Sequence, residues 1–229
     1  MKNQFINILK MRRSHYALDK KTTIADGEIV KLVEEAVYLT PSAFNSQSAR
    51  AVVLFHKDHD RLWDIVTEEL RKIVPEDRFA ATDVKMQAFK KAYGTVLFFE
   101  DQSVVQNLQE RFPLYRDVFP LWSNQSAGML NLVVWTALAE NGLGASLQHY
   151  NPIIDAEVTK AFNLPSNWKL IAQMPEITGE QVVMAEDFDA LAVKVSEGLR
   201  GVTAPKVPFN TTEQYLFGLA NGQVIVYKN

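Results

Sequence analysis

The chain has 229 residues, 47% of them hydrophobic and 22% charged, so it is large and apolar enough to fold without disulfide or metal staples. A formal net charge of −3 provides no basic field, and we expect no nucleic-acid partner. The sequence contains no cysteine, which excludes disulfides, thiolate metal sites and thiol nucleophiles.

Membrane insertion is not expected either. The first residues, Met1 to Phe5, lack the apolar core of a signal peptide. The most apolar run, Met129 to Ala139, is too short for a membrane span and contains Asn131. We therefore expect a cytoplasmic protein with no membrane partner.

In the first half of the chain, apolar periodicity predicts four helices and two buried strands. A capping box at Thr23 and Asp26 starts the second helix, and Pro41 ends it near residue 40. The third helix stops near Pro75, and Gly94 separates the fourth helix from the second strand. The helices are centred on residues 5–9, 29–37, 62–73 and 84–92, and the strands cover residues 51–55 and 95–99.

The second half begins with the longest predicted helix, from Ser123 to Glu140, which Asn141-Gly142 ends. An extended piece, a shorter helix and a third core strand follow, over residues 145–150, 154–162 and 170–174. Long helices alternate irregularly with strands, which favours an α+β layer fold. We expect one domain over residues 1–195 and a turn-rich extension over 196–229, packed on the body or on a partner subunit.

Common catalytic motifs are missing from the sequence. It has no nucleophile elbow and no P-loop, and Gly142-Leu143-Gly144 lacks the third glycine of a dinucleotide fingerprint. His56 and His59 have no third ligand nearby, so we interpret them as solvated residues and expect no metal site. A bound organic cofactor would explain a chain so poor in catalytic side chains.

Three polar segments stand out against this background. Arg12-Arg13-Ser14, with Tyr16, could clamp a phosphate, or the arginines could complement a helix dipole. The segment from Pro41 to Ser48 carries amides that suit the edge of a flavin, although such residues also cap turns. In the segment from Gly144 to Pro152, small residues allow close approach to a flat ligand, whereas His149 alone is typical of a structural histidine.

Together these segments resemble the FMN-dependent nitroreductase family, in particular the compact branch that includes the copper-induced nitroreductase. The resemblance spans roughly residues 5 to 195. It is carried by Arg12-Arg13-Ser14 and by three longer blocks, PSAFNSQSAR (41–50), AYGTVLFFED (92–101) and NGLGASLQHYNP (141–152).

This resemblance implies a three-layer α+β sandwich with a central, mainly antiparallel sheet flanked by helices, in an intertwined homodimer. It implies FMN as the cofactor, bound between the subunits. Arg12, Arg13 and Ser14 would hold the phosphate and ribityl chain, with Tyr16 nearby. Ser42, Asn45 and Gln47 would reach the flavin across the dimer. Gln148, His149 and Tyr150 would lie against the isoalloxazine, mainly through backbone groups near its reactive N5.

The implied activity is a ping-pong reaction in which NADH or NADPH gives a hydride to flavin N5 and a small oxidised aromatic, such as a nitro compound or quinone, then takes the electrons. No catalytic side chain is implied, and the aromatic residues Phe44, Phe112, Tyr115 and Trp122 are candidates for the pocket wall.

The chain departs from the family pattern at two places. Where the family has Q-M-P-F-G, this chain has Glu176 and Ile177 after Pro175. Where the family supplies a basic pair to the phosphate in R-V-K-V, this chain keeps only the lysine, Lys194, which the resemblance implies as a further phosphate contact. These departures leave an alternative open, a flavin-binding sensor or regulatory dimer with little turnover. Reductive dehalogenation or flavin breakdown within the same family is a third hypothesis.

Overall fold

The computed structural model describes residues 3–16, 20, 22 and 24–178. In these ranges the helices are α1 (Gln4–Met11), α2 (Asp26–Leu39), η1 (Ala43–Asn45), α3 (His56–Arg71), α4 (Glu76–Lys90), α5 (Gln102–Arg111), η2 (Pro113–Tyr115), α6 (Phe119–Glu140) and α7 (Asp155–Ala161), where η marks a 3-10 helix. The strands are β1 (Ala49–Phe55), β2 (Gly94–Asp101), β3 (Leu143–Ala145) and β4 (Trp168–Thr178).

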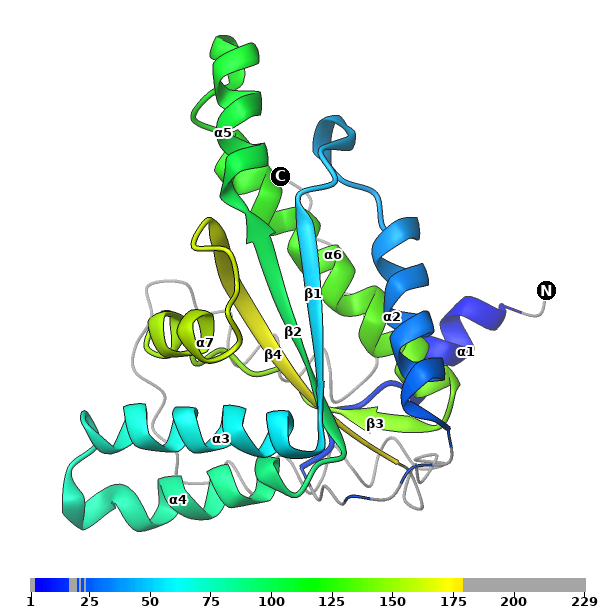
Figure 1. The fold of residues 1–229 in the computed structure, drawn as a ribbon. Helices are drawn as coiled ribbons and strands as arrows, with labels where there is room; N and C mark the ends of the chain where they lie inside the picture. The colour runs from blue at the N-terminus through cyan, green and yellow to red at the C-terminus, as the bar shows by residue number, and fades with distance from the viewer. Residues whose placement is uncertain (1–2, 17–19, 21, 23, 179–229) are drawn as a thin grey trace, which may run out of the picture. The chain divides into compact units, whose positions relative to one another are not determined.

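These strands form one antiparallel sheet in the order β1-β2-β4-β3 (Figure 1). Across the sheet, the register aligns Phe55, Gly94, Glu176 and Ala145, and we call this row the β3 end. The opposite end, where β1 begins beside Glu100, is the Glu100 end. At about 3.3 Å per strand residue, the two ends of β1 lie roughly 20 Å apart.

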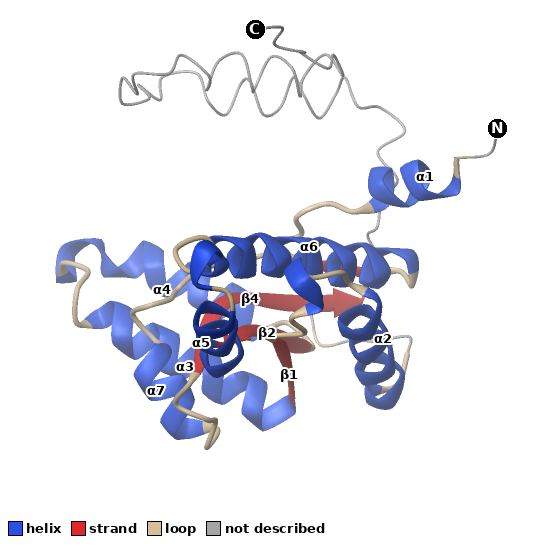
Figure 2. Cartoon of the chain, turned by 90° about the horizontal axis from the view of Figure 1, so that it is seen from above, coloured by secondary structure: helices blue, strands red, loops and turns tan. Residues whose placement is uncertain are grey.

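Helices cover both faces of the sheet, so the chain forms three layers (Figure 2). Successive side chains of β2 point to opposite faces, as the pleat of a strand requires. Leu97 and Phe99 pack with α3, α4 and α7, whereas Val96 and Phe98 pack with α2 and α6. This arrangement confirms the predicted α+β sandwich with an antiparallel central sheet.

Element boundaries show where the sequence patterns were weak. Helix α3 begins at His56, earlier than predicted, because its first turn is polar and gives no apolar periodicity. Helix α5 was not predicted at all. Only Val105 and Leu108 of α5 are buried, and its start is fixed by Asp101, whose side chain accepts a hydrogen bond from the Ser103 backbone at 3.1 Å.

Two further predictions need correction. His59 is not solvated: it is 1% exposed, its Nδ1 lies 2.9 Å from Thr95 Oγ1, and burial lowers its pKa to about 4. The extended piece expected from residue 145 is a strand that already ends at Ala145. The Thr23 capping box and the extension over residues 196–229 lie outside the described residues, as does the expected domain boundary at 195.

The described ranges contain no helix long and apolar enough to cross a membrane.

Candidate functional site

The first and third polar segments meet at the β3 end of the sheet. Ser14 forms a parallel bridge with Ala145, and the backbone N–H of His15 donates to the Ala145 carbonyl at 3.0 Å. Gly144 permits this contact, because a Cβ at that position would lie 2.8 Å from the His15 ring. A segment that follows the first helix is therefore fixed beside one that lies some 130 residues later in the chain.

A cavity of about 490 Å³ lies beside this junction. Helix α6 contributes residues spaced three, four and seven positions apart, which is one face of a helix. The residues lining the cavity are Arg12, Ser14, Gly128, Asn131, Leu132, Trp135, Leu147 and His149. Its volume is typical of a small-molecule site.

Arg12 is the cationic group of this cavity. Its guanidinium carbon lies 4.2 Å from the centre of the Trp135 ring, a distance typical of a cation–π contact. Burial, and then the nearby charge of Arg13, lower the pKa of Arg12. Among the described residues no acidic side chain forms an ion pair with Arg12, so its charge is available to an anion.

The other predicted residues of the first segment are placed differently. Arg13 is not among the residues that line the cavity, and its Nη1 donates to the Arg12 carbonyl at 2.6 Å. Tyr16 is 58% exposed, and its ring lies 6.4 Å from that of Phe89, on the α4 side of the sheet.

Of the predicted residues in the third segment, only His149 lines the cavity. The Gln148 side chain donates to Ser146 Oγ at 2.7 Å, and its backbone pairs with Gln173 of β4. The Tyr150 ring packs edge-on against Trp63 in the core, and burial raises its pKa to about 12. Any ligand contact by Tyr150 must therefore come from its backbone or from a different conformation.

The second segment forms a separate structure. Phe44, Asn45 and Gln47 have positive φ angles, and the Gln47 N–H donates to Ser42 Oγ at 3.0 Å. Neither Ser42 nor the two amides line the Arg12 cavity. The segment joins the Glu100 end of the sheet, where the Ala43 N–H donates to Ser126 of α6 at 3.4 Å.

Aromatic rings gather around this segment. The Phe44 ring is half-exposed, and four rings from α5 onward lie with their centres 5.1–5.8 Å from its own: Phe112, Tyr115, Phe119 and Trp122. The four candidate wall residues predicted from the sequence thus form one cluster, joined by Phe119.

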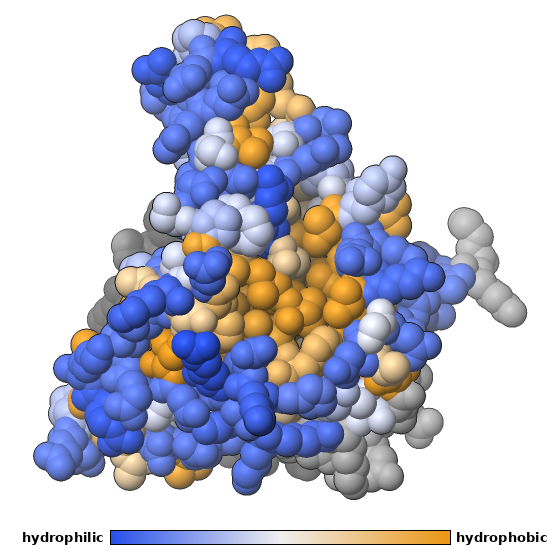
Figure 3. Space-filling model, in the orientation of Figure 1, coloured by the Kyte–Doolittle hydropathy of each residue, from blue (hydrophilic) through white to orange (hydrophobic). Residues whose placement is uncertain are grey.

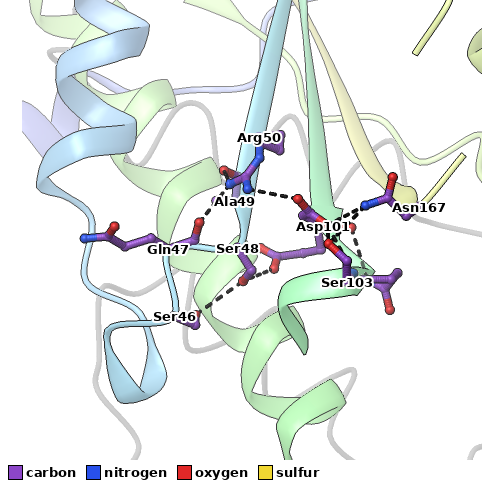
Figure 4. A network of polar contacts seen from close by, with 10 residues as sticks. Ser46, Gln47, Ser48, Ala49, Arg50, Asp101, Ser103 and Asn167 are labelled. Atoms are coloured by element: carbon purple, nitrogen blue, oxygen red, sulfur yellow. Dashed lines mark hydrogen bonds and ion pairs between the residues drawn. The ribbon is translucent and has the colours of Figure 1, made fainter. Parts of the chain in front are cut away.

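A dense polar network supports the same end of the sheet (Figure 4). Glu100 is fully buried, and its Oε2 accepts hydrogen bonds from Ser48 at 2.5 Å and Ser123 at 2.7 Å. Asp101 pairs with Arg50 at 2.9 Å and also accepts from Asn167. Burial raises the pKa of Glu100, against the effect of the two hydroxyl donors.

Sequence reasoning missed five residues that line the cavity, of which Leu147 lies in the third segment and four lie on α6: Gly128, Asn131, Leu132 and Trp135. Asn131 is 6% exposed, yet its Oδ1 has no hydrogen-bond partner within the described ranges, and the same holds for Trp135 Nε1. A signal existed, since an asparagine interrupts the most apolar stretch of the sequence three residues after a glycine.

Of the two places where the sequence departs from the family pattern, the structure describes only the first. Glu176 is buried at the β3 end, where neither carboxyl oxygen has a partner in the described part of the chain, and burial raises its pKa to about 8. Lys194 lies outside the described residues. No group of three His, Asp or Glu side chains that could hold a metal ion occurs within the described residues.

Comparison with known proteins agrees with this architecture. The Saccharomyces cerevisiae protein HBN1 is 34% identical over 172 residues, which are 74% of this chain and 85% of that protein. The nitroreductase CinD from Lactococcus lactis, solved in complex with chloramphenicol, is 47% identical at a TM-score of 0.70, over 77% of this chain and 89% of that chain. CinD structures with nicotinic acid and with 4-nitrophenol match at 48% identity and a TM-score of 0.69.

A more distant protein from Desulfovibrio desulfuricans, solved in complex with FMN, shares the fold at 21% identity and a TM-score of 0.59, over 80% of this chain and 90% of that chain. The family model described as "Nitroreductase family" matches residues 9–175, well over half of the chain. The chain therefore belongs to the nitroreductase family, as its polar segments predicted.

Proposed function

We propose that this protein is an FMN-dependent oxidoreductase that uses NADH or NADPH to reduce small nitroaromatics and quinones. Membership of the nitroreductase family supports an oxidoreductase. What we propose beyond this is that the cofactor is FMN, that the electron donor is NADH or NADPH, and that the substrates are nitroaromatics and quinones.

The Arg12 cavity fits FMN in charge and in volume. A phosphate needs a cation that is not already neutralised, and Arg12 is half-buried with no acidic partner among the described residues. Trp135 beneath the guanidinium fixes its orientation. The unpartnered Asn131 amide suits a ligand that is polar along much of its length. The cationic, unpaired Arg12 in a cavity of about 490 Å³ is the observation on which the proposal rests.

Bound FMN would supply the redox chemistry, taking two electrons from NAD(P)H and passing them to an oxidised aromatic in a second half-reaction. The side chains of the protein would then bind and orient. Arg12 would neutralise phosphate charge, Ser14 would donate a hydroxyl hydrogen bond beside it, and His149 would close the cavity from the loop that follows β3.

A second copy of the chain would complete the site. Ser42, Asn45 and Gln47 do not reach the Arg12 cavity of their own chain, so we propose that they contact FMN across a homodimer. Exposed apolar surface supports this assembly. Helix α6 exposes Leu121, Met129, Leu132 and Val133. A separate apolar area, bordered by hydrophilic side chains, lies on the face of the molecule seen in Figure 3.

The substrate class comes from the relatives. CinD was solved with 4-nitrophenol and chloramphenicol, which are nitroaromatic, and with nicotinic acid, whose ring is that of the nicotinamide donors. Binding of both kinds of ring by one relative supports a single slot used in turn by the donor and the acceptor. A cytoplasmic location stays a prediction.

The test is spectroscopic. We expect the purified protein to bind FMN, to be yellow, and to bleach when NADH or NADPH is added without oxygen. Addition of 4-nitrophenol or a quinone should then restore the colour. A protein that binds no FMN contradicts the proposal, and a protein that bleaches but shows no steady-state turnover supports the sensor alternative.

A further inference from the structure

Asn131 has a buried amide oxygen without a hydrogen-bond partner among the described residues. Its side chain lies on the long helix α6, it is 6% exposed, and its Oδ1 accepts no hydrogen bond from any described residue. A buried polar group left unsatisfied costs about 1–3 kcal/mol, so such groups are rare in folded proteins without a functional reason. The Asn131 amide therefore needs a hydrogen-bond partner that the described residues do not supply.

The location of Asn131 indicates that a ligand supplies this partner. It lines the Arg12 cavity together with Gly128, Leu132 and Trp135, which follow the same face of α6. Trp135 Nε1 is a second buried atom without a partner in the described ranges. One helix face thus brings Asn131 and Trp135 to the lining of the cavity, and each has one buried polar atom without a partner in the described ranges, where Arg12 also has no counter-ion.

We infer that Asn131 binds the ligand of the Arg12 cavity directly through its amide, and that it is a site residue in addition to the three polar segments. This inference rests on the proposed function, in which the ligand is FMN. An amide offers two donors and an acceptor, which suit the hydroxyl and carbonyl groups of a flavin nucleotide. Trp135 supports the site through its ring, whose centre lies 4.2 Å from the guanidinium carbon of Arg12.

The inference gives Asn131→Leu two effects of opposite sign. Leucine has nearly the shape of asparagine but no polar atoms, so the melting temperature of the apoprotein should stay equal or rise. The dissociation constant for FMN should rise about tenfold, because the hydrogen bonds of the amide are lost. Apoprotein melting by circular dichroism and quenching of FMN fluorescence measure the two effects separately, without enzyme turnover.

Asn124→Leu is the matched control. Asn124 is an exposed asparagine on the same helix and does not line the cavity, so its replacement should leave FMN affinity within twofold of wild type. Asn131→Asp is the second test variant. It keeps the shape and a polar head group, but its carboxylate opposes a phosphate held by Arg12, so FMN affinity should fall here too.

Each outcome decides between the hypotheses. Wild-type protein that binds no FMN overturns the proposed function and this inference with it. Wild-type protein that binds FMN, with both Asn131 variants inside the twofold range of the control, overturns only the inference. If Asn131→Leu does not fold, the affinity of Asn131→Asp decides on the same scale.

Discussion

Buried polar groups are treated differently at the two ends of the sheet. At the Glu100 end most of them bind one another: Glu100 Oε2 accepts from two serines and Asp101 pairs with Arg50, although Glu100 Oε1 has no partner among the described residues. Near the β3 end, Glu176 and Asn131 are buried and have no partner in the described part of the chain. A carboxylate held by two hydroxyl donors belongs to a structural network, whereas a buried side chain that makes no hydrogen bond either binds a ligand or lowers the stability of the fold.

The two unpartnered side chains near the β3 end differ in whether they line the cavity. Asn131 lines a cavity and faces a site that a ligand can fill. Glu176 does not line this cavity, and it lies between Gly94 of β2 and Ala145 of β3 in the register of the sheet. We therefore expect Asn131 to affect binding and Glu176 to affect stability.

The largest effect should come from Glu176. Burial, with a smaller contribution from Asp26, raises its pKa from 4.5 to about 8 in the folded protein. Between these two values the folded chain keeps a proton that the unfolded chain has lost, so the stability present below pH 4.5 falls as pH rises through 8. The free energy of unfolding should fall by roughly 4 kcal/mol over this range, at 1.36 kcal/mol per pKa unit. Urea unfolding from pH 5 to 8 measures it.

Glu176→Gln is the matched variant, because it keeps the volume and cannot ionise. Its unfolding free energy should depend less on pH than that of the wild type. The dependence should not vanish, since burial also raises the pKa of Glu100. Equal pH dependence in the two proteins would show that Glu176 finds a partner or reaches water in solution.

Glu100→Ala tests the opposite end of the sheet. The substitution leaves a cavity and removes the acceptor of Ser48 and Ser123, so it should lower the free energy of unfolding by about 3 kcal/mol. Glu100→Gln keeps an acceptor for the two hydroxyls and should cost less than half as much. Urea unfolding at pH 6 compares them, and equal losses would mean that the two hydrogen bonds contribute little.

The fold was predictable wherever apolar periodicity was strong. Helix α2 and strand β1 follow their stripes of apolar residues, and α6 ends at Asn141-Gly142, where Gly142 has φ +77°. Helix α5 escaped prediction because a mostly polar helix that buries two residues gives no such stripe. His59 was misjudged because its partner Thr95 lies on strand β2, 36 residues further along the chain, and sequence proximity does not show such contacts.

The candidate site was predictable only in part. Arg12, Ser14 and His149 line one cavity, and their contacts with FMN stay a prediction. The sequence marks Asn131 as a polar residue within an apolar run, but its place in the cavity depends on helix α6 lying beside Arg12, which the sequence does not show. The side chains of Gln148 and Tyr150 turn out to serve packing and hydrogen bonding inside the chain, a direction that spacing alone does not specify.

Arg12→Gln tests whether the Arg12 cavity holds the phosphate of FMN. Loss of the charged hydrogen bonds to a phosphate costs about 2 kcal/mol, so the dissociation constant for FMN should rise about 30-fold. The apoprotein should lose little stability, because Arg12 has no ion pair to break among the described residues. Arg12→Lys keeps the charge without the planar fork and should show an intermediate affinity. FMN fluorescence titration measures all three proteins, and unchanged affinity in Arg12→Gln would place the phosphate elsewhere.

Gly128→Ala should give the smallest effect and the one with the clearest sign. A glycine inside a helix is about 1 kcal/mol less favourable than alanine, and a Cβ at Gly128 meets no atom within 4 Å. The free energy of unfolding of the apoprotein should therefore rise, even though the new methyl group enters the cavity and weakens FMN binding by a few fold. Gly27→Ala is the matched control, because Gly27 lies in α2, outside the cavity, and its added Cβ also meets nothing within 4 Å. Only Gly128→Ala should raise the free energy of unfolding while weakening FMN binding, because the space beside Gly128 is occupied by the ligand and not by other side chains. If both variants bind FMN with equal affinity, α6 does not belong to the site.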